Sequence, residues 1–295
     1  MVEYLKILIL WVLDMRELFK NKTFDMERAL YHLVSADVED CTFAGEADGE
    51  SALKECSDVN IKNCVFSLRY PLWHAKGHSV VASRFDDTAR APLWYSFDGK
   101  YINCDINCVK FLRECTNIEF SGCKIKSPEF GWKCKNIALS DTEVEGEYLF
   151  LDSYGISLEN VKMKGKYSFQ YIDGLTIRDS YLDTKDAFWH SKNVRVENST
   201  VKGEYLGWFS EGLTLVNCKI IGTQPLCYCK DLTLIDCTME GCDLSFEYSE
   251  VDATVNGHID SVKNVKSGRV VADSVGEIVA SDAVMECTGE VIIRK

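Results

Sequence analysis

Residues 192–201, KNVRVENSTV, have the pattern of one amphipathic strand followed by a polar turn. The same pattern occurs at 135–144 (KNIALSDTEV) and at 230–239 (KDLTLIDCTM), and the three copies are separated by multiples of 19 residues. Within a copy, apolar residues such as Val194 and Val196 lie two apart, which is the period of a strand with one buried face. A repeat of this length indicates a solenoid in which each copy is one coil of chain.

The turn after each strand carries Asn or Asp at a constant place, with Ala and Gly as the two exceptions. The residues at this place are Asp40, Asn63, Ala82, Asn103, Gly122, Asp141, Asn160, Asp179, Asn198, Asn217 and Asp236. From Asn103 onward every step is 19 residues, and the earlier steps are 23, 19 and 21. Because Asn and Asp tolerate the left-handed backbone conformation and form local hydrogen bonds, we interpret this column as a ladder of turns rather than as a set of ligands.

The cysteines follow the same register. The position after the turn residue is Cys41, Cys64, Ser83, Cys104, Cys123, Thr142, Val161, Ser180, Ser199, Cys218 or Cys237, and a second column runs from Cys56 to Cys229. Small residues and thiols replace one another there, which is typical of buried positions. The spacing contains no paired C-x-x-C motifs, so we expect reduced thiols, no metal site of this kind and no cofactor.

These patterns predict an all-β fold, a single-stranded right-handed parallel β-helix of about 19-residue coils spaced about 4.8 Å apart. Residues 15–250 form this β-helix in the prediction, and residues 251–295 form C-terminal β coils and a cap over the exposed sheet edge. Residues 1–14 are expected to be an extension or a capping segment. Their apolar run is too short to span a bilayer and lacks the basic region and cleavage site of a signal peptide, so we expect a cytoplasmic protein.

A resemblance supports this prediction. The stretches ERALYH (27–32), RYPLWH (69–74), TARAPLWY (88–95), KDAFWH (185–190) and SGRVVADSVGEI (267–278) resemble the DUF3737 family of bacterial proteins of unknown function. The resemblance covers about residues 15–280, with residues 1–14 outside it. It implies a pectate-lyase-like right-handed β-helix and an intracellular bacterial protein, and it brings no established activity.

Aromatic residues gather in two columns after an inward column that runs from Leu30 to Phe246. The first outward column contains Trp73, Trp94, Trp132, Trp189 and Trp208, and the next contains His32, Glu55, His74, Tyr95, Tyr171, His190, Phe209, Tyr228 and Tyr248. Stacked rings stabilise a solenoid, but they also bind sugar rings or other extended ligands. We therefore propose Trp73, Trp94, Trp189, Trp208, His32, Glu55 and Tyr95 as candidate binding residues.

A charged column on the first coils is the candidate catalytic site. Four residues before the tryptophan column, successive coils carry Glu27, Glu50, Arg69 and Arg90. Like charges on neighbouring strands cost stability, which suggests a functional reason, although Arg28 offers local pairing to a carboxylate. Together with His74, these residues supply two carboxylates for acid–base chemistry and arginines for an anionic substrate. A metal held by His32, His74 and Glu55 is chemically allowed but is not our expectation.

Three functions remain open. The first is a noncatalytic binding or scaffold solenoid for a glycan-like or protein ligand. The second is an intracellular carbohydrate-active enzyme, a lyase or hydrolase, that uses the N-terminal cluster. The third is an acidic mimic of nucleic acid, suggested by the net charge of −13 from 46 acidic and 33 basic residues. The same charge opposes binding to nucleic acid or to an anionic membrane, so we expect neither partner, and oligomerisation stays open.

Overall fold

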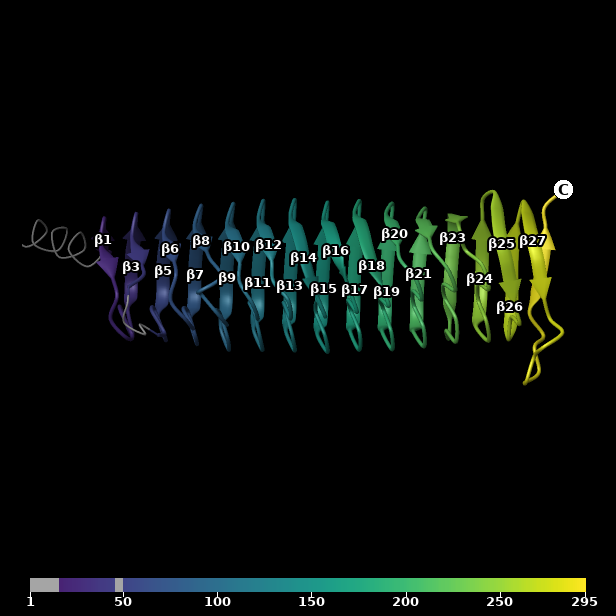
Figure 1. Ribbon diagram of the computed structural model, residues 1–295, viewed down its shortest axis with the longest axis horizontal. Coiled ribbons are helices and arrows are strands. Elements are labelled where there is room, and N and C mark those ends of the chain that lie inside the picture. The colour runs from purple at the N-terminus through teal and green to yellow at the C-terminus, as the bar shows by residue number, and fades with distance from the viewer. Residues whose placement is uncertain (1–15, 46–49) are drawn as a thin grey trace, which may run out of the picture.

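The computed structural model describes residues 16–45 and 50–295, and its fold is the predicted right-handed parallel β-helix (Figure 1). The chain winds through about 14 turns of about 19 residues, stacked in sequence order from one end of the rod to the other. Within these ranges there is no helix long and apolar enough to cross a membrane. The predicted segment at residues 1–14 lies outside the described residues.

The first side of each coil is a strand of a long-strand sheet. Its strands are β1 (Glu17–Lys20), β3 (Val34–Glu39), β5 (Ser57–Lys62), β7 (Lys76–Val81), β9 (Phe97–Ile102), β11 (Thr116–Ser121), β13 (Lys135–Ser140), β15 (Tyr154–Glu159), β17 (Asp173–Arg178), β19 (Lys192–Glu197), β21 (Glu211–Val216), β23 (Leu232–Glu240), β24 (Glu250–Val255), β26 (Ser267–Ala272) and β28 (Glu290–Ile293). Neighbouring strands pair in parallel, and Val194 of β19 lies between its copies Leu175 and Leu213. The 19-residue register is therefore confirmed.

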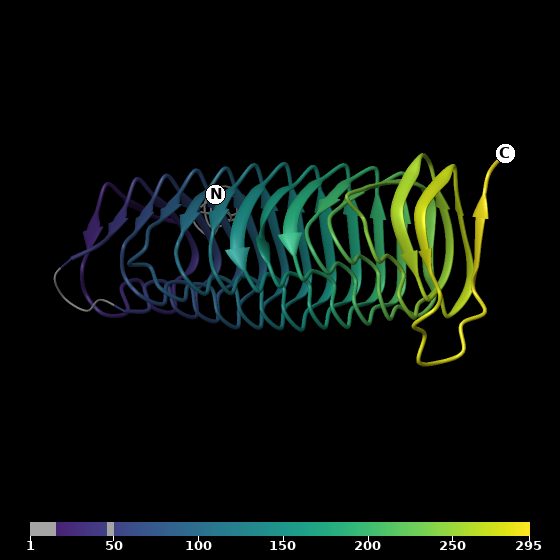
Figure 2. The same ribbon diagram turned by 45° about the vertical axis from the view of Figure 1, so that its right-hand side comes forward.

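The second side is a short-strand sheet, which also pairs in parallel from coil to coil. Its strands are β2 (Thr23–Phe24), β4 (Thr42–Phe43), β6 (Val65–Phe66), β8 (Arg84–Phe85), β10 (Asp105–Asn107), β12 (Lys124–Lys126), β14 (Glu143–Glu147), β16 (Lys162–Lys166), β18 (Tyr181–Lys185), β20 (Thr200–Lys202) and β22 (Lys219–Ile221). Near the C-terminus, β23 takes part in both sheets, and β25 (His258–Lys263) pairs with β27 (Ser274–Val279). The coils of this end and a projecting loop are yellow in Figure 2.

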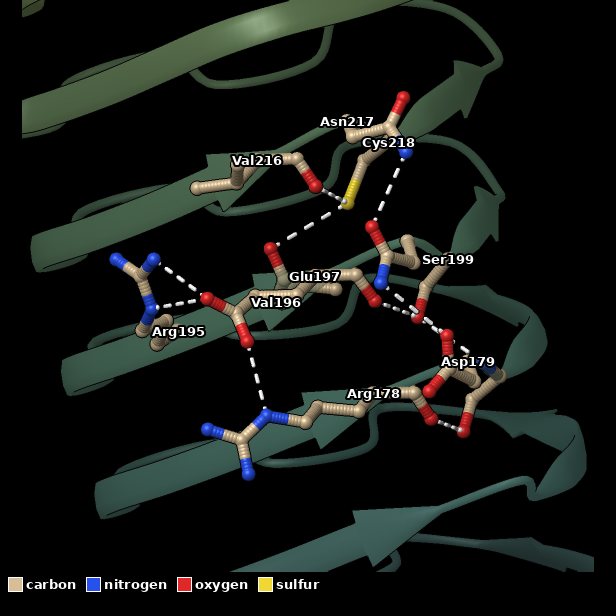
Figure 3. Close-up of polar contacts among 11 residues, drawn as sticks. Arg178, Asp179, Arg195, Val196, Glu197, Ser199, Val216, Asn217 and Cys218 are labelled. Atoms are coloured by element: carbon tan, nitrogen blue, oxygen red, sulfur yellow. Dashed lines mark hydrogen bonds and ion pairs between the residues drawn. The ribbon is translucent and has the colours of Figure 1, made fainter.

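The turn between the two sheets is the predicted polar ladder. Asp179, Asn198 and Asn217 all have positive φ, between 49° and 51°. The Asn198 side-chain amide donates to Asp179 Oδ1 at 3.2 Å, and that of Asn217 donates to Asn198 Oδ1 at 3.1 Å. Figure 3 shows Asp179 and Asn217 of this column. The amide of each side chain thus donates a hydrogen bond to the side-chain oxygen on the preceding coil. The interpretation of this column as a ladder of turns is confirmed.

The cysteine columns are buried and all 14 thiols are free. Cys218 shows the local reason: its Sγ lies 3.4 Å from the Val196 carbonyl on the preceding coil and 3.3 Å from the Val216 carbonyl (Figure 3). Ser199 fills the same place one coil earlier, where its hydroxyl donates to the Glu197 carbonyl at 2.6 Å. A small weak donor therefore fits this column, and burial raises the pKa of thiols such as Cys56 to about 12.

The third side of each coil, between a short strand and the next long strand, is a series of tight turns. On a single coil Tyr70, Leu72 and His74 all have φ near 60°, so every second residue of the turn is in the left-handed region. The same alternation of left-handed residues recurs on other coils. The inward members of this column are buried, for example Leu72 and Phe150, as predicted. Gly131 takes the same place with φ of 77°, because a Cβ there would lie 2.6 Å from the ring of Phe150.

One buried polar pair interrupts the apolar core of the N-terminal coils. His78 in β7 is fully buried, and its Nε2 lies 3.0 Å from the Tyr101 hydroxyl. Gly99 on the next coil makes room for the imidazole, since a Cβ there would lie 2.5 Å from Nε2. Nδ1 has no hydrogen-bond partner among the described residues, and burial lowers the pKa of His78 to about 4.

Candidate functional site

The charged column of the N-terminal coils is stacked as the sequence predicts. The Ser51 N–H donates to the Arg69 carbonyl at 2.8 Å, and the Tyr70 N–H donates to the Arg90 carbonyl at 2.9 Å. These bonds set Glu50, Arg69 and Arg90 on successive coils of the third side. The side chains are half-buried or exposed, and the cluster lies on the surface of the rod.

The two carboxylates of this cluster each contact an arginine. Glu50 Oε1 lies 2.8 Å from Arg69 Nη2, and Glu27 Oε1 lies 3.4 Å from Arg28 Nε. The local pairing predicted for Arg28 is present, and Glu50 forms an ion pair with Arg69 on the next coil. Arg90 is exposed and forms no ion pair among the described residues. Because each carboxylate has a cationic neighbour, the geometry favours an ion-pair ladder over two carboxylates that share a proton.

The histidines of the same coils have different partners. His32 Nδ1 lies 3.5 Å from Glu55 Oε2, whereas the His74 ring stacks on Tyr95 with 5.1 Å between centroids. In the part of the chain that the structure describes, no three His, Cys, Asp or Glu side chains converge as a metal would require. His32, Glu55, His74 and Tyr95 form one outward column, which leaves them as candidate contact residues.

The tryptophans are half-buried and use their polar atoms within the protein. Trp73, Trp94, Trp189 and Trp208 each donate the indole N–H to a carbonyl of the next coil, at 2.7 to 2.9 Å. The acceptor of Trp94, for example, is the Lys110 carbonyl. This bond ties each third-side turn to the following coil, a structural role that the sequence did not reveal.

The N-terminal tryptophans pack their ring faces within the protein. Trp73 and Trp94 stack with 5.2 Å between centroids and 6° between planes. The Arg113 guanidinium then lies 5.0 Å from the centroid of Trp94 and 5.4 Å from that of Trp132. We call Trp73, Trp94, Arg113 and Trp132 the inner ladder. Both faces of Trp94 are therefore covered, and Trp73 and Trp132 each have one face packed within the inner ladder, which leaves little open ring face for sugar stacking.

A second set of rings lies further out on the C-terminal coils, and we call it the aromatic edge. It consists of Tyr171, His190, Phe209, Tyr228 and Tyr248, whose successive centroids are 5.1, 5.0, 4.9 and 5.8 Å apart. Tyr171 is 56% exposed and Phe209 is 43% exposed. The first three pairs are within 15° of parallel, so the rings cover each other's faces and turn their edges outward. The sequence showed this column without marking it as a site.

A hollow on another side of the rod lies over the short-strand sheet. Adjoining depressions of about 450, 380 and 330 Å³ share lining residues across strands β10 to β22, and together we call them the charged groove. Shared residues include Lys126, Glu145 and Lys164. The signal in the sequence was the run of like-charged strands KIK (124–126), EVEGE (143–147) and KMKGK (162–166), which period-two analysis treats only as solvent-facing residues.

Comparison with known structures returns β-helix proteins at low identity. A surface adhesin of Streptococcus pneumoniae, PfbA, matches with 8% identity and a TM-score of 0.39, over 88% of this chain and 80% of that one. The A-module of the Azotobacter vinelandii mannuronan C-5 epimerase AlgE4 matches with 10% identity and a TM-score of 0.30, over 80% and 79% of the two chains. At these values the likeness concerns the fold alone.

No curated protein matches the sequence. The profile of one family, described as protein of unknown function (DUF3737), matches residues 17–293, nearly the whole described chain. The chain therefore belongs to the DUF3737 family.

Proposed function

We propose that the protein is a noncatalytic binding solenoid and that its ligand is a protein docked on the aromatic edge. The observation that carries this proposal is the continuous ladder of rings from Tyr171 to Tyr248, in which the first three rings are exposed and the last two are half-buried. Tyrosine and phenylalanine, which make up four of the five rings, are among the side chains enriched at protein interfaces.

The orientation of the rings favours a protein over a glycan at this place. Sugar binding by aromatic residues needs a free ring face, but His190 and Phe209 have rings stacked on both sides. Outward ring edges and hydroxyls can instead pack against side chains and accept or donate hydrogen bonds. Trp189 and Trp208 directly precede His190 and Phe209 in the sequence, and their ring centroids are 5.5 Å apart. These two tryptophans therefore form a second stacked pair on the same coils. The other proposed contact residues, Trp73, Trp94, His32, Glu55 and Tyr95, extend this side toward the N-terminus.

The test compares protein capture by the wild type with capture by a Tyr171→Ser/Phe209→Ser variant. The matched control is Tyr154→Ser, because Tyr154 is 53% exposed but lies on the long-strand sheet. We expect the same set of proteins on the wild type and the control, with at least one lost from the double variant at an unchanged melting temperature. If the double variant melts early and loses no captured protein, the aromatic edge only stabilises the coils.

The enzymatic alternative rests on Glu27, Glu50, Arg69, Arg90 and His74, and one observation keeps it in play: Glu50 and Arg69 form a close pair on an accessible surface. It predicts cleavage of neutral or anionic oligosaccharides by the wild type and none by Glu50→Gln. Absence of any product from the wild type across divalent metals and pH would count against it.

A further inference from the structure

At the centre of the charged groove, three neighbouring strands each carry one sign of charge. Outward residues of β12 are Lys124 and Lys126, those of β14 are Glu143, Glu145 and Glu147, and those of β16 are Lys162, Lys164 and Lys166. Because the strands are in register, each acidic side chain has a lysine on a neighbouring coil. The groove therefore presents bands of alternating sign across a molecule that is otherwise strongly acidic.

The ion pairs between neighbouring strands of the groove leave some lysines without a carboxylate partner among the described residues. Glu143, Glu145 and Glu147 lie within 4 Å of Lys162, Lys126 and Lys166 respectively. On the next coils Asp183 contacts Lys202 at 3.0 Å. The hydrogen bond to Glu147 raises the pKa of Lys166, and the one to Asp183 raises that of Lys202.

Lys164 is the cation at the centre of the groove without such a contact. It lines both of the larger depressions, and no carboxylate of the described residues lies within 4 Å of its Nζ. Its column neighbours Glu145 and Asp183 are each drawn to another lysine. An anionic group of a ligand would therefore meet Lys164 without first displacing an internal partner.

Tyr181 provides an aromatic ring of a different kind from those on the third side. It lines the largest depression, it is 44% exposed, and its column neighbours are Lys162 and Thr200. No ring of the described residues stacks on it. Lysine side chains add aliphatic stems to the walls, and an exposed ring beside such stems suits the apolar face of a sugar.

The spacing of the column indicates the arrangement of charge on the ligand. Lys126, Lys164 and Lys202 occupy one column on every second coil, about 10 Å apart for strands spaced near 4.8 Å. Glu145 and Asp183 occupy the coils between them. A sugar unit in an extended glycan advances by roughly one coil. Acidic sugars on alternate units would thus meet lysines, and the hydroxyls of neutral sugars between them would donate to the carboxylates.

We propose that the charged groove binds a linear glycan in which acidic and neutral sugars alternate. A glycan with a carboxylate on every sugar fits less well, because every second carboxylate would face Glu145 or Asp183. This site is independent of the aromatic edge, so either one can fail without the other.

The experiment is isothermal titration of the full chain with oligosaccharides of hyaluronan, which alternates glucuronate with N-acetylglucosamine, and with oligogalacturonate of matched length. We expect hyaluronan to bind more tightly and to weaken as sodium chloride is added. Lys164→Gln should reduce the affinity about tenfold or more, the usual effect of losing one charge-assisted hydrogen bond. Tyr181→Ala should reduce it several-fold.

The control is Lys100→Gln, an exposed lysine of β9 on the long-strand sheet that already contacts Glu119 at 3.2 Å. This variant should bind as the wild type does. The proposal is overturned if hyaluronan does not bind, if oligogalacturonate binds equally well, or if Lys100→Gln weakens binding as much as Lys164→Gln. Binding of a basic peptide in place of either glycan would also overturn it, since the acidic bands would then be the recognition element.

Discussion

Trp94 on the third side and Lys164 on the short-strand sheet differ in how far the protein satisfies their side chains. The indole N–H of Trp94 donates to a carbonyl of the next coil, and its ring is covered on both faces. The ammonium of Lys164 has no carboxylate of the described residues within 4 Å. Each belongs to a column in which the same residue type returns on other coils: Trp73 and Trp132 for Trp94, and Lys126 and Lys202 for Lys164. The repeat alone therefore does not distinguish a scaffold residue from a contact residue. What distinguishes them is whether neighbouring coils already satisfy the side chain.

The aromatic edge lies between these two cases. Its rings stack on each other as the inner ladder does, but Tyr171 and Phe209 keep about half of their surface in water. We expect the edge to contribute little to stability and the inner ladder to contribute much. The following predictions are ordered by the size of the effect that separates the core, the inner ladder and the exposed surfaces.

Truncation of a core ring should give the largest effect. Phe169 is fully buried and stacks between Phe150 and Phe188, with centroids 5.9 and 5.3 Å away. Phe169→Ala should lower the free energy of unfolding by about 3–5 kcal/mol through lost burial and a cavity, as measured by urea denaturation. Phe209→Ala on the aromatic edge should cost less than about 1 kcal/mol. Equal losses would remove the distinction between core and edge.

Acid should weaken the core through His78. Burial lowers its pKa from 6.5 to about 4, so the unfolded chain binds the proton more readily. The resulting stability, about 3 kcal/mol, is fully present above pH 6.5 and is lost as pH falls toward 4. Unfolding at pH 7 and at pH 4.5 should show a smaller pH effect in His78→Val/Tyr101→Phe than in the wild type. An identical pH dependence in both proteins would contradict this assignment.

The inner ladder and the groove should differ in their response to truncation. Trp94→Ala removes the bond to the Lys110 carbonyl and the contacts with Trp73 and Arg113, which should cost about 2–3 kcal/mol. Tyr181→Ala should change the free energy of unfolding by less than about 0.5 kcal/mol, because no other ring packs on it. Thermal unfolding of both variants decides the point, and a stable Trp94→Ala protein would leave the inner ladder open for ligand contact.

Reversing one charge in the groove should cost less stability than truncating the inner ladder. Glu145→Lys places a third cation between Lys126 and Lys164, and like charges on adjacent strands cost about 1 kcal/mol or less. The loss should shrink in high salt because these side chains are exposed. The free energy of unfolding of the neutral control, Glu145→Gln, should lie between those of the wild type and Glu145→Lys. A loss that salt does not reduce would point to altered packing instead of repulsion.

The fold could be predicted from the sequence because each coil repeats the same pattern of turn, small and buried residues. Asn198 marks the turn, Ser199 the small inward position and Val194 the buried strand face, and the structure confirms each. The 19-residue period also aligned Glu50 with Arg69, which the structure joins at 2.8 Å. The boundaries proposed at residues 14 and 250 stay predictions.

The surfaces were harder to predict because they depend on which face of a side chain is covered. The column that contains Trp94 and Trp132 also contains Arg113, and only the structure shows its guanidinium packed between the two rings. Likewise, the run KIK, EVEGE, KMKGK was visible, but the hollow above it depends on the shape of the stacked strands. Lys164 stands out only when the partners of its neighbours are known.

The central claim is that a protein ligand docks on the aromatic edge, and site-specific photocrosslinking tests it most directly. We would introduce p-benzoylphenylalanine at position 209 or at position 154, both exposed aromatic places, and irradiate cells that produce each protein. The account predicts a discrete crosslinked species for position 209 and none for position 154. Equal crosslinking at both positions, or a discrete species at position 154 alone, would contradict it.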